Sequence, residues 1–273
     1  MDALGDRMKM YEGMETGRVG MPRLPLMVRI DGKGFSRWTR GLRYPFDERL
    51  QALRVEVTRK LVEELGAVAG YCQSDEITLM LWARDTKTAL YCGGKFQKIV
   101  SHSASMATAY WNQLVPEFLP EKVGQPAMFD ARAWNVPTQE EAVNVFLWRE
   151  WDASKNSVSM AARAYYSSKE IFGKNSPEMQ EMLFKKGVNW NDYPVWAKRG
   201  TYLGRRTFNR KLTPDELSQL PPRHDARRNP DMVITRTGVT VLDLPPLGQI
   251  ANRIGVIFDG DEPIMNPPSK AEE

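Results

Sequence analysis

The chain has 273 residues, enough for one large domain or a domain with an appendage, and its hydrophobic (42%) and aromatic (10%) fractions are those of a soluble globular protein. No segment could cross a membrane, the polar N-terminal residues lack a secretory signal, and a net charge of +4 selects no partner by itself. Only Cys72 and Cys92 and two distant histidines are present, which favours a reducing cytoplasm and argues against a disulfide framework or a zinc cluster. Any bound metal is therefore expected to be a hard cation on carboxylates.

Hydrophobic periodicity divides the first half of the chain into strands and helices. The predicted elements are a strand at 24–30, a helix from the N-cap Asp47 to Gly66, a hairpin of strands 68–72 and 77–82, a helix at 96–114 and a strand at 128–136. This order, β-α-β-β-α-β, is that of the ferredoxin-like fold, an α+β arrangement found in RNA-binding modules and in the palm of many polymerases. Two further helices are predicted at 138–152 and 156–168.

The composition changes after residue 205. Residues 1–205 are predicted to form the catalytic domain with its helical additions, and residues 206–273 a basic, proline-rich C-terminal extension of unassigned role. A cluster of basic residues around this boundary suits a polyanionic partner. Its members are Lys198, Arg199, Arg205, Arg206, Arg210, Lys211, Arg223, Arg227 and Arg228. The elements predicted in the extension are strands at 232–235 and 239–242, joined by a turn at Thr237 and Gly238, and a strand at 254–258.

Two acidic residues fall at one edge of the predicted sheet. Asp31 ends the first strand, and Asp75 lies at the tip of the hairpin. Because the first strand lies beside the third in this fold, the two carboxylates are predicted to converge. Carboxylates and a backbone carbonyl, which Gly32 can present in a tight turn, are ligands that Mg²⁺ prefers. Two such ions would clamp the attacking and leaving oxygens of a phosphoryl transfer.

A substrate that carries a triphosphate also needs cationic side chains. Arg29, Lys33 and Arg37 surround the first of the two acids. Lys95 and Lys98 lie about one helical turn apart on the predicted long helix. Lysine and arginine at these positions are candidates for holding phosphate oxygens.

Five ordered motifs extend through this part of the chain. They are Arg29-Ile30-Asp31-Gly32-Lys33-Gly34-Phe35, Pro45-Phe46-Asp47, Tyr71-Cys72-Gln73-Ser74-Asp75-Glu76, Phe129-Asp130-Ala131-Arg132 and Trp148-Arg149-Glu150-Trp151-Asp152-Ala153, with Asn156 just beyond. Together they resemble the tRNA-histidine guanylyltransferase family, which includes the guanylyltransferase-like reverse polymerases. The resemblance covers about residues 5–205.

The resemblance implies a polymerase-type palm that adds nucleotides, GTP above all, to an RNA 5′ end in the 3′-to-5′ direction, after ATP or GTP has activated the 5′ phosphate. It implies that Asp31 and Asp75 hold two Mg²⁺ ions, that Gly32 contributes its carbonyl, and that Glu76 supports this site. It also implies a homo-oligomer, a dimer of dimers. The positions that it implies for binding triphosphate or base are Arg29, Lys33, Gly34, Phe35, Asp47, Ser74, Lys95, Lys98 and Arg132.

One motif departs from the family. Enzymes devoted to tRNA-histidine carry His-Ile-Asn-Asn where this chain has Ser154-Lys155-Asn156-Ser157. The missing histidine favours the like-protein branch, which is similar to a template-directed repair polymerase for 5′-truncated tRNA or similar RNA. The residues predicted to contact RNA are Arg149, Asn156, Arg205 and Arg206.

Two other functions fit the predicted fold. A non-catalytic RNA-binding module would carry exposed aromatic residues on its central strands, whereas these strands carry mainly Leu, Val, Ile and Met. A palm-type nucleotide cyclase or signalling enzyme would share the two-metal chemistry, and only dependence on RNA separates it from the favoured interpretation. Trp148 and Trp151 are interpreted as packing residues rather than base-stacking ones.

Overall fold

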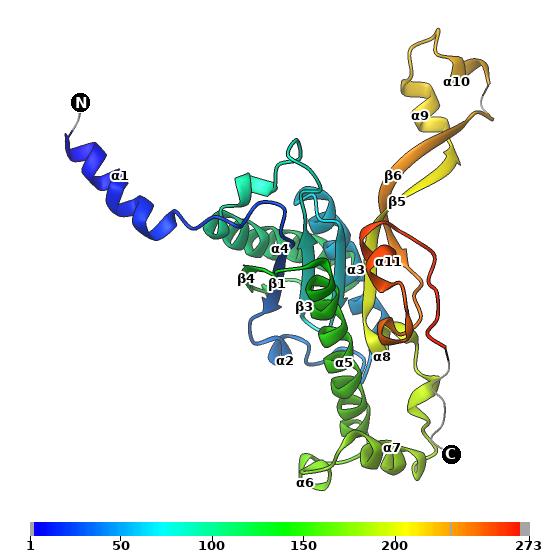
Figure 1. The fold of residues 1–273 in the computed structure, drawn as a ribbon. Coiled ribbons are helices and arrows are strands. Elements are labelled where there is room, and N and C mark those ends of the chain that lie inside the picture. Colours follow the sequence, from blue (N-terminus) through cyan, green and yellow to red (C-terminus); the bar gives the residue numbers. More distant parts are fainter. Residues whose placement is uncertain (1–2, 230, 268–273) are drawn as a thin grey trace.

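The computed structural model describes residues 3–229 and 231–267 and is built on a six-stranded sheet. The strands lie in the order β4-β1-β3-β2-β5-β6, and each neighbouring pair is antiparallel (Figure 1). The strands are β1 (Leu26–Gly32), β2 (Ala69–Gln73), β3 (Glu76–Leu81), β4 (Phe129–Asn135), β5 (Thr201–Lys211) and β6 (Val233–Leu242). The α-helices are α1 (Ala3–Thr16), α2 (Phe35–Trp38), α3 (Glu48–Glu64), α4 (Phe96–Phe118), α5 (Gln139–Arg163), α6 (Ser168–Ile171), α7 (Ser176–Phe184), α8 (Val195–Arg199), α9 (Pro214–Gln219), α10 (Asp225–Arg228) and α11 (Arg253–Phe258).

The elements predicted between residues 24 and 136 are confirmed, with ends shifted by a few residues. Asp47 is the N-cap of α3, where its side chain accepts a hydrogen bond from the Arg49 main-chain nitrogen. Strands β1 and β3 are neighbours, as the predicted convergence of Asp31 and Asp75 requires. The structure is therefore a mixed α/β fold on an antiparallel sheet.

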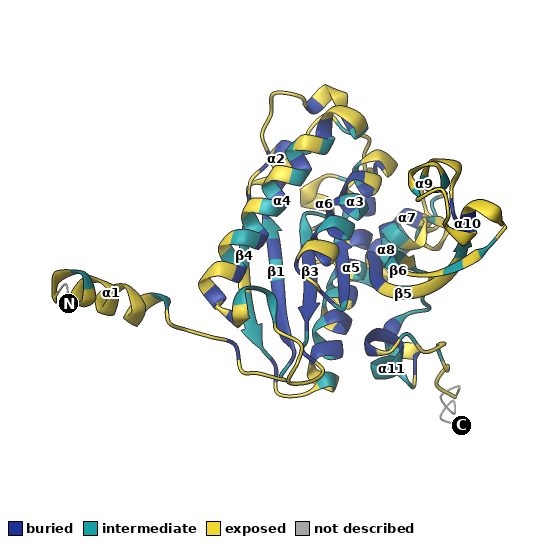
Figure 2. Cartoon of the chain, turned by 90° about the horizontal axis from the view of Figure 1, so that it is seen from above, coloured by how far each residue is buried: buried dark blue, intermediate teal, exposed yellow. Residues whose placement is uncertain are grey.

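Alternating side chains along β1 pack into two separate cores. Leu26, Val28 and Ile30 are fully buried in a core with α3 and α4, whereas Met27 is fully buried in a second core with α5 and α11. Figure 2 shows β1 and β3 as buried strands among these helices. Because side chains two positions apart share a face, Asp31 points to the α5 side of the sheet.

Helix α5 is continuous, so the prediction of separate helices at 138–152 and 156–168 is wrong. No glycine or proline interrupts residues 139–163, and the Thr138 hydroxyl accepts a hydrogen bond from the Glu141 main-chain nitrogen (3.1 Å). Its 25 residues span about 37 Å, well beyond the length of a seven-residue strand. The helix therefore runs past the sheet towards α6 and α7 (Figure 1).

Strands β5 and β6 form a long ribbon that leaves the sheet and carries α9 and α10 at its far end (Figure 1). The hairpin predicted at 232–242 is wrong, because both of its segments lie in the single strand β6, which pairs with β5 from Tyr202 to Lys211. The Thr-Gly pair is a local turn signal, and the ten-residue pairing with a distant strand outweighs it. A Cβ at Gly238 would lie 3.0 Å from the ring of Phe208, so this glycine makes room for that ring.

The strand predicted at 254–258 is also wrong, because these residues form helix α11. A short apolar run is compatible with either a buried strand or a buried helix. Val256, Ile257 and Phe258 pack into the core on the α5 side of the sheet, and the boundary predicted after residue 205 falls inside β5. Part of the predicted extension therefore helps to cover the central sheet.

Helix α1 lies away from the body of the molecule (Figure 2). None of its described residues is buried. Among the helices that the structure describes, none combines the length and the apolar character that a membrane span requires.

Arg205 stabilises the end of α3. Its guanidinium group donates hydrogen bonds to the carbonyl oxygens of Val62 (3.3 Å), Glu63 (3.1 Å) and Ala67 (3.2 Å). These carbonyls belong to the last turn of the helix and the residues after it, and the Val62 and Glu63 oxygens also accept hydrogen bonds from the main-chain nitrogens of Ala67 (3.0 Å) and Gly66 (3.3 Å).

We expect Arg205→Met to lower the free energy of unfolding by about 1 kcal/mol, because the Ala67 carbonyl loses its side-chain donor and the Val62 and Glu63 carbonyls lose a charged donor additional to their main-chain ones. Urea unfolding followed by circular dichroism measures this change. The control Arg236→Met, on an exposed position of β6, should stay within about 0.5 kcal/mol of the wild type. Equal stabilities of the two variants would contradict a capping role for Arg205.

Candidate functional site

Strand pairing brings Asp31 and Asp75 to the same corner of the sheet. Asp31 lies opposite Glu76 in the β1–β3 register, and the Gly32 main-chain nitrogen donates a hydrogen bond to the Asp75 carbonyl oxygen (3.1 Å). Ser74, in the turn before Asp75, has a φ of 55°, a conformation that is uncommon outside glycine and clusters at functional sites. The convergence predicted from the sequence is therefore present in the structure.

Gly32 is required by this close approach. A Cβ at this position would lie 2.6 Å from the Phe35 ring and 2.8 Å from the Asp75 Cβ, distances that real Cβ atoms do not show. Phe35 cannot easily move, because it packs against Trp38 and Trp111 at ring-centroid distances of 5.0 and 5.1 Å. A larger residue at position 32 would therefore separate the two acids.

Neither carboxylate forms an ion pair with a residue that the structure describes. Burial raises the pKa of Asp75, the neighbouring Asp31 raises it further, and a hydrogen bond from Ser74 and the charge of Arg54 act in the opposite direction. A cation between the two carboxylates would offset both the cost of burying the Asp75 charge and its repulsion from Asp31. Two carboxylates and the nearby Gly32 carbonyl form a set of hard oxygen donors, which suits Mg²⁺.

Glu76 is held by arginines rather than left free. Its carboxylate lies 2.5 Å from Arg149 Nε and 3.9 Å from Arg29 Nε, and Arg149 Nη2 also bonds to Asp152 (3.0 Å). Burial raises the pKa of Glu76, and the charges and hydrogen bond of the two arginines lower it. Since Arg149 comes from α5, this network ties the long helix to the strand that follows Asp75.

Trp148 is more exposed than we expected for a packing residue. It is 47% exposed, and the guanidinium groups of Arg149 and Arg29 lie 4.5 and 5.5 Å from its ring centroid. Trp151 is 57% exposed. Both tryptophans are therefore only partly packed, and Trp148 covers the arginines that hold Glu76.

A pocket of about 730 Å³ opens beside the two acids. Its wall combines the end of β1, the hairpin turn, residues 42–47, the first turns of α3 and the part of α5 that runs past the sheet. The predicted site residues that line it are Asp31, Gly32, Gly34, Phe35, Asp47, Ser74, Asp75, Glu76, Arg149 and Asn156. The fold thus gathers into one pocket residues that lie more than a hundred positions apart.

Asp47 is firmly held within this wall. Its carboxylate accepts hydrogen bonds from the main-chain nitrogens of Arg43 (3.1 Å) and Arg49 (2.9 Å) and from the Arg49 guanidinium group (2.8 Å). Burial raises the pKa of Asp47, but these hydrogen bonds outweigh burial and lower the pKa to about 2. Asp47 is therefore a permanent negative charge that orders the loop before α3.

The remaining predicted residues lie outside this pocket. Arg132 lies on β4 directly opposite Arg29, on the same sheet face as Asp31, and bonds to Asp130 (3.2 Å). Lys95 and Lys98 begin α4, and Lys95 bridges to Val19 at the end of the sheet opposite the acids. The other residues outside the pocket are Arg29, which lies beside Glu76 and Trp148, Lys33, beside Gly32, and Arg205 and Arg206, whose guanidinium groups donate to main-chain carbonyls.

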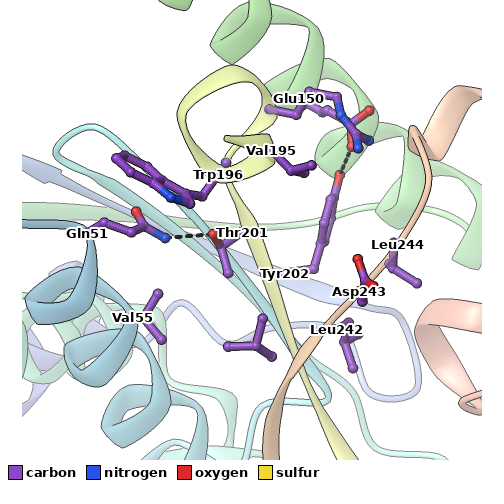
Figure 3. A pocket seen from close by; sticks show the side chains of 13 residues that line it. Gln51, Val55, Glu150, Val195, Trp196, Thr201, Tyr202, Leu242, Asp243 and Leu244 are labelled. Atoms are coloured by element: carbon purple, nitrogen blue, oxygen red, sulfur yellow. Dashed lines mark hydrogen bonds between the residues drawn. The ribbon is translucent and has the colours of Figure 1, made fainter. Parts of the chain in front are cut away.

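A second, smaller pocket of about 360 Å³ lies between α3, α8 and the β5–β6 strands (Figure 3). Two pairs of its polar groups bond to each other, since Gln51 Nε2 donates to the Thr201 hydroxyl (2.7 Å) and the Tyr202 hydroxyl donates to Glu150 (3.0 Å), whereas the buried Gln51 Oε1 has no hydrogen-bond partner among the described residues. Glu150 also accepts a hydrogen bond from the Leu247 main-chain nitrogen (3.0 Å). These contacts fasten α5 to β5 and to the C-terminal segment.

Three arginines in the large pocket were not predicted from the sequence: Arg43, Arg54 and Arg163. Arg54 had a usable signal. It lies one position after Leu53 on the buried side of α3, where the helical pattern calls for an apolar residue. Arg43 and Arg163 lie in a loop and at a helix end, where the sequence pattern carries no such signal.

Comparison with known proteins places this geometry in a family. A sequence model of tRNAHis guanylyltransferase matches residues 5–137. The chain is similar to the structure of a bacterial tRNA(His) guanylyltransferase-like protein in complex with ATP, with a TM-score of 0.75 and 36% identity over 90% of this chain and 94% of that one. A structure of such a bacterial protein in complex with GTP has a TM-score of 0.70 and 34% identity over the same shares.

An enzyme of known name is also similar. The tRNA(His) guanylyltransferase of Saccharomyces cerevisiae is 27% identical over 210 residues, which cover 70% of this chain and 87% of that protein. Similarity at 36% identity across most of both chains, together with the match to the family model, shows that this chain belongs to the tRNA(His) guanylyltransferase family of nucleotidyltransferases.

Proposed function

We propose that this protein adds nucleotides, GTP favoured, to the 5′ end of tRNA or a tRNA-like RNA in the 3′-to-5′ direction, by two-metal phosphoryl transfer after ATP or GTP has activated the 5′ phosphate. The observation that carries the proposal is the pair Asp31 and Asp75 at the rim of a pocket large enough for a nucleotide. The ATP and GTP complexes of the bacterial relatives support the choice of substrates.

The strand order supports a polymerase-type palm. The strands β4-β1-β3-β2 are antiparallel and are connected as β-α-β-β-α-β, which is the ferredoxin-like order. In our proposal Asp31, Asp75 and the Gly32 carbonyl hold Mg²⁺, which when bound neutralises phosphate charge and orients the reacting oxygens. Glu76 is a positioning residue, since its carboxylate is bound to Arg29 and Arg149.

The protein itself supplies position and charge. Gly32 keeps the two acids close, and the Ser74 turn aims Asp75 into the pocket. Asn156 and Arg149, which line the same pocket from α5, are proposed to contact the RNA end. Holding the reacting groups in this way converts a bimolecular step into a nearly unimolecular one and needs no covalent enzyme intermediate.

The two alternative functions receive less support from the structure. Among the strands β1, β2 and β3, the aromatic residue is Tyr71, which is 1% exposed, so the described residues of these three strands offer no stacking platform for RNA. A palm-type cyclase or signalling enzyme would use the same acids, and the RNA assay described below distinguishes it from our proposal.

The Lys155-Asn156 segment, without the family histidine, favours repair-type addition. A cytoplasmic dimer of dimers completes the proposal.

We expect the protein to add nucleotides to a tRNA that lacks its first 5′ nucleotide. The assay uses Mg²⁺, labelled triphosphates, the truncated tRNA and a full-length histidine tRNA, with products resolved on a gel. Addition to the truncated tRNA alone, matching the opposite base, would establish templated repair. Triphosphate consumption without addition to either RNA would instead favour the free-nucleotide enzyme.

We expect Asp31→Asn and Asp75→Asn each to lower the rate of nucleotide addition by about 1,000-fold or more, because each removes a metal-binding charge worth several kcal/mol. Single-turnover kinetics measure the loss, and circular dichroism verifies the fold. The control Asp6→Asn, on the exposed helix α1, should keep the wild-type rate. Substantial activity in either site variant would overturn the two-metal assignment.

The affinity for Mg²⁺ should fall as the pH is lowered from about 7 to about 5. The raised pKa of Asp75 means that its proton is retained to a higher pH than in an exposed aspartate, and metal binding must release that proton. Calorimetric titrations at several pH values, in buffers of different ionisation enthalpy, measure both the affinity and the proton release. A constant affinity across this range would contradict the prediction.

A further inference from the structure

Arg54 is a buried cation without a partner. The residue is 5% exposed, and its Nε atom is buried with no hydrogen-bond partner. Its guanidinium group takes part in no hydrogen bond or ion pair with any residue that the structure describes. This is unusual, because a guanidinium group has five donors and its burial costs free energy unless they are satisfied.

The groups around Arg54 do not balance its charge. The ionisable groups that act on it are Cys72, Asp75 and Tyr71. Burial raises the pKa of both the Cys72 thiol and the Tyr71 hydroxyl, so both are neutral near pH 7. Asp75 is then the remaining anion of the three, and in the proposed function it is committed to a metal ion.

Arg54 belongs to the wall of the large pocket. Asp47, the N-cap of α3, lines the cavity that contains Asp31 and Asp75, and so do Leu50 and Arg54, which follow on successive turns of that helix. Asp47 is not available to Arg54, since it lies seven residues, or about 10 Å, away along the helix and is bound by Arg43 and Arg49. Arg54 therefore borders a space that a ligand can enter.

We propose that Arg54 binds a phosphate group of the substrate beside Asp75, from either the nucleoside triphosphate or the RNA 5′ end. A guanidinium group suits this role, because its planar set of donors matches phosphate oxygens and it cannot lose its charge. The inference rests on the proposed function only for the choice of substrates. An arginine kept buried and unpaired is a cost to stability that an arriving anion removes.

The test compares Arg54→Met, Arg54→Lys and the wild type by equilibrium binding to the full chain, without turnover. The probes are GTP, guanosine, and one short RNA with either a 5′-phosphate or a 5′-hydroxyl. Arg54→Met should weaken binding of one phosphorylated probe about 10- to 100-fold and leave its phosphate-free counterpart unchanged. Arg54→Lys should retain part of the affinity, because it keeps the charge. The control is Lys60→Met, which removes a partly exposed charge from the same helix.

The outcomes show whether Arg54 binds the triphosphate, the RNA 5′ phosphate or neither of them. A loss confined to GTP assigns Arg54 to the triphosphate, and a loss confined to the phosphorylated RNA assigns it to the 5′ end. Arg54→Met should also raise the melting temperature of the ligand-free protein, because an unpaired buried charge is removed. Unchanged affinity for both phosphorylated probes, or equal losses with and without phosphate, would overturn the proposal.

These measurements remain informative if the proposed function is wrong. Because binding is read without catalysis, Arg54→Met can lose affinity for GTP in a protein that never extends RNA. In that case the Arg54 assignment would hold and the nucleotide-addition proposal would fail. A lower melting temperature together with unchanged affinities would instead identify Arg54 as an internal counter-charge for Asp75.

Discussion

The antiparallel pairing of β1 with β3 is the constraint on which the candidate site depends. It places Asp31 opposite Glu76 and lets the Gly32 nitrogen bond to the Asp75 carbonyl. A slip of one residue in this register would move Asp31 to the opposite face of the sheet, into the core with α3 and α4. The alternation of buried Leu26, Val28 and Ile30 on that face makes such a slip costly, so the hydrophobic core also determines where the acids point.

The charges around this corner divide into satisfied and unsatisfied sets. Glu76 is bound by Arg29 and Arg149, and Asp47 is bound by Arg49 and two main-chain nitrogens. Asp31, Asp75 and Arg54 form no ion pair among the described residues. A pocket that keeps both negative and positive groups unpaired is suited to a ligand that brings a metal cation and phosphate anions together, and proteins hold such strain mainly at functional sites.

The depth of the pocket comes from elements outside the β1–β3 corner. The second half of α5 projects beyond the sheet, and its buried Val158, Ala161 and Ala162 pack against α7. Glu150, in the middle of α5, binds Tyr202 of β5 and the Leu247 nitrogen, which ties the helix to the C-terminal part of the chain. The second half of α5 and the C-terminal part of the chain are therefore part of the scaffold that shapes the site.

The sequence by itself determined the elements from β1 to β4, the N-cap Asp47 and the convergence of Asp31 and Asp75, because hydrophobic period, capping and turn chemistry are local properties of the chain. Only the tertiary structure decided that β6 is one strand, that α11 is a helix and that Arg54 is buried beside Asp75. Each of these depends on a partner distant in sequence. The free energy of pairing β6 with β5, or of burying Val256 and Phe258 against the sheet, outweighs weak local preferences, and it cannot be evaluated until those partners are placed.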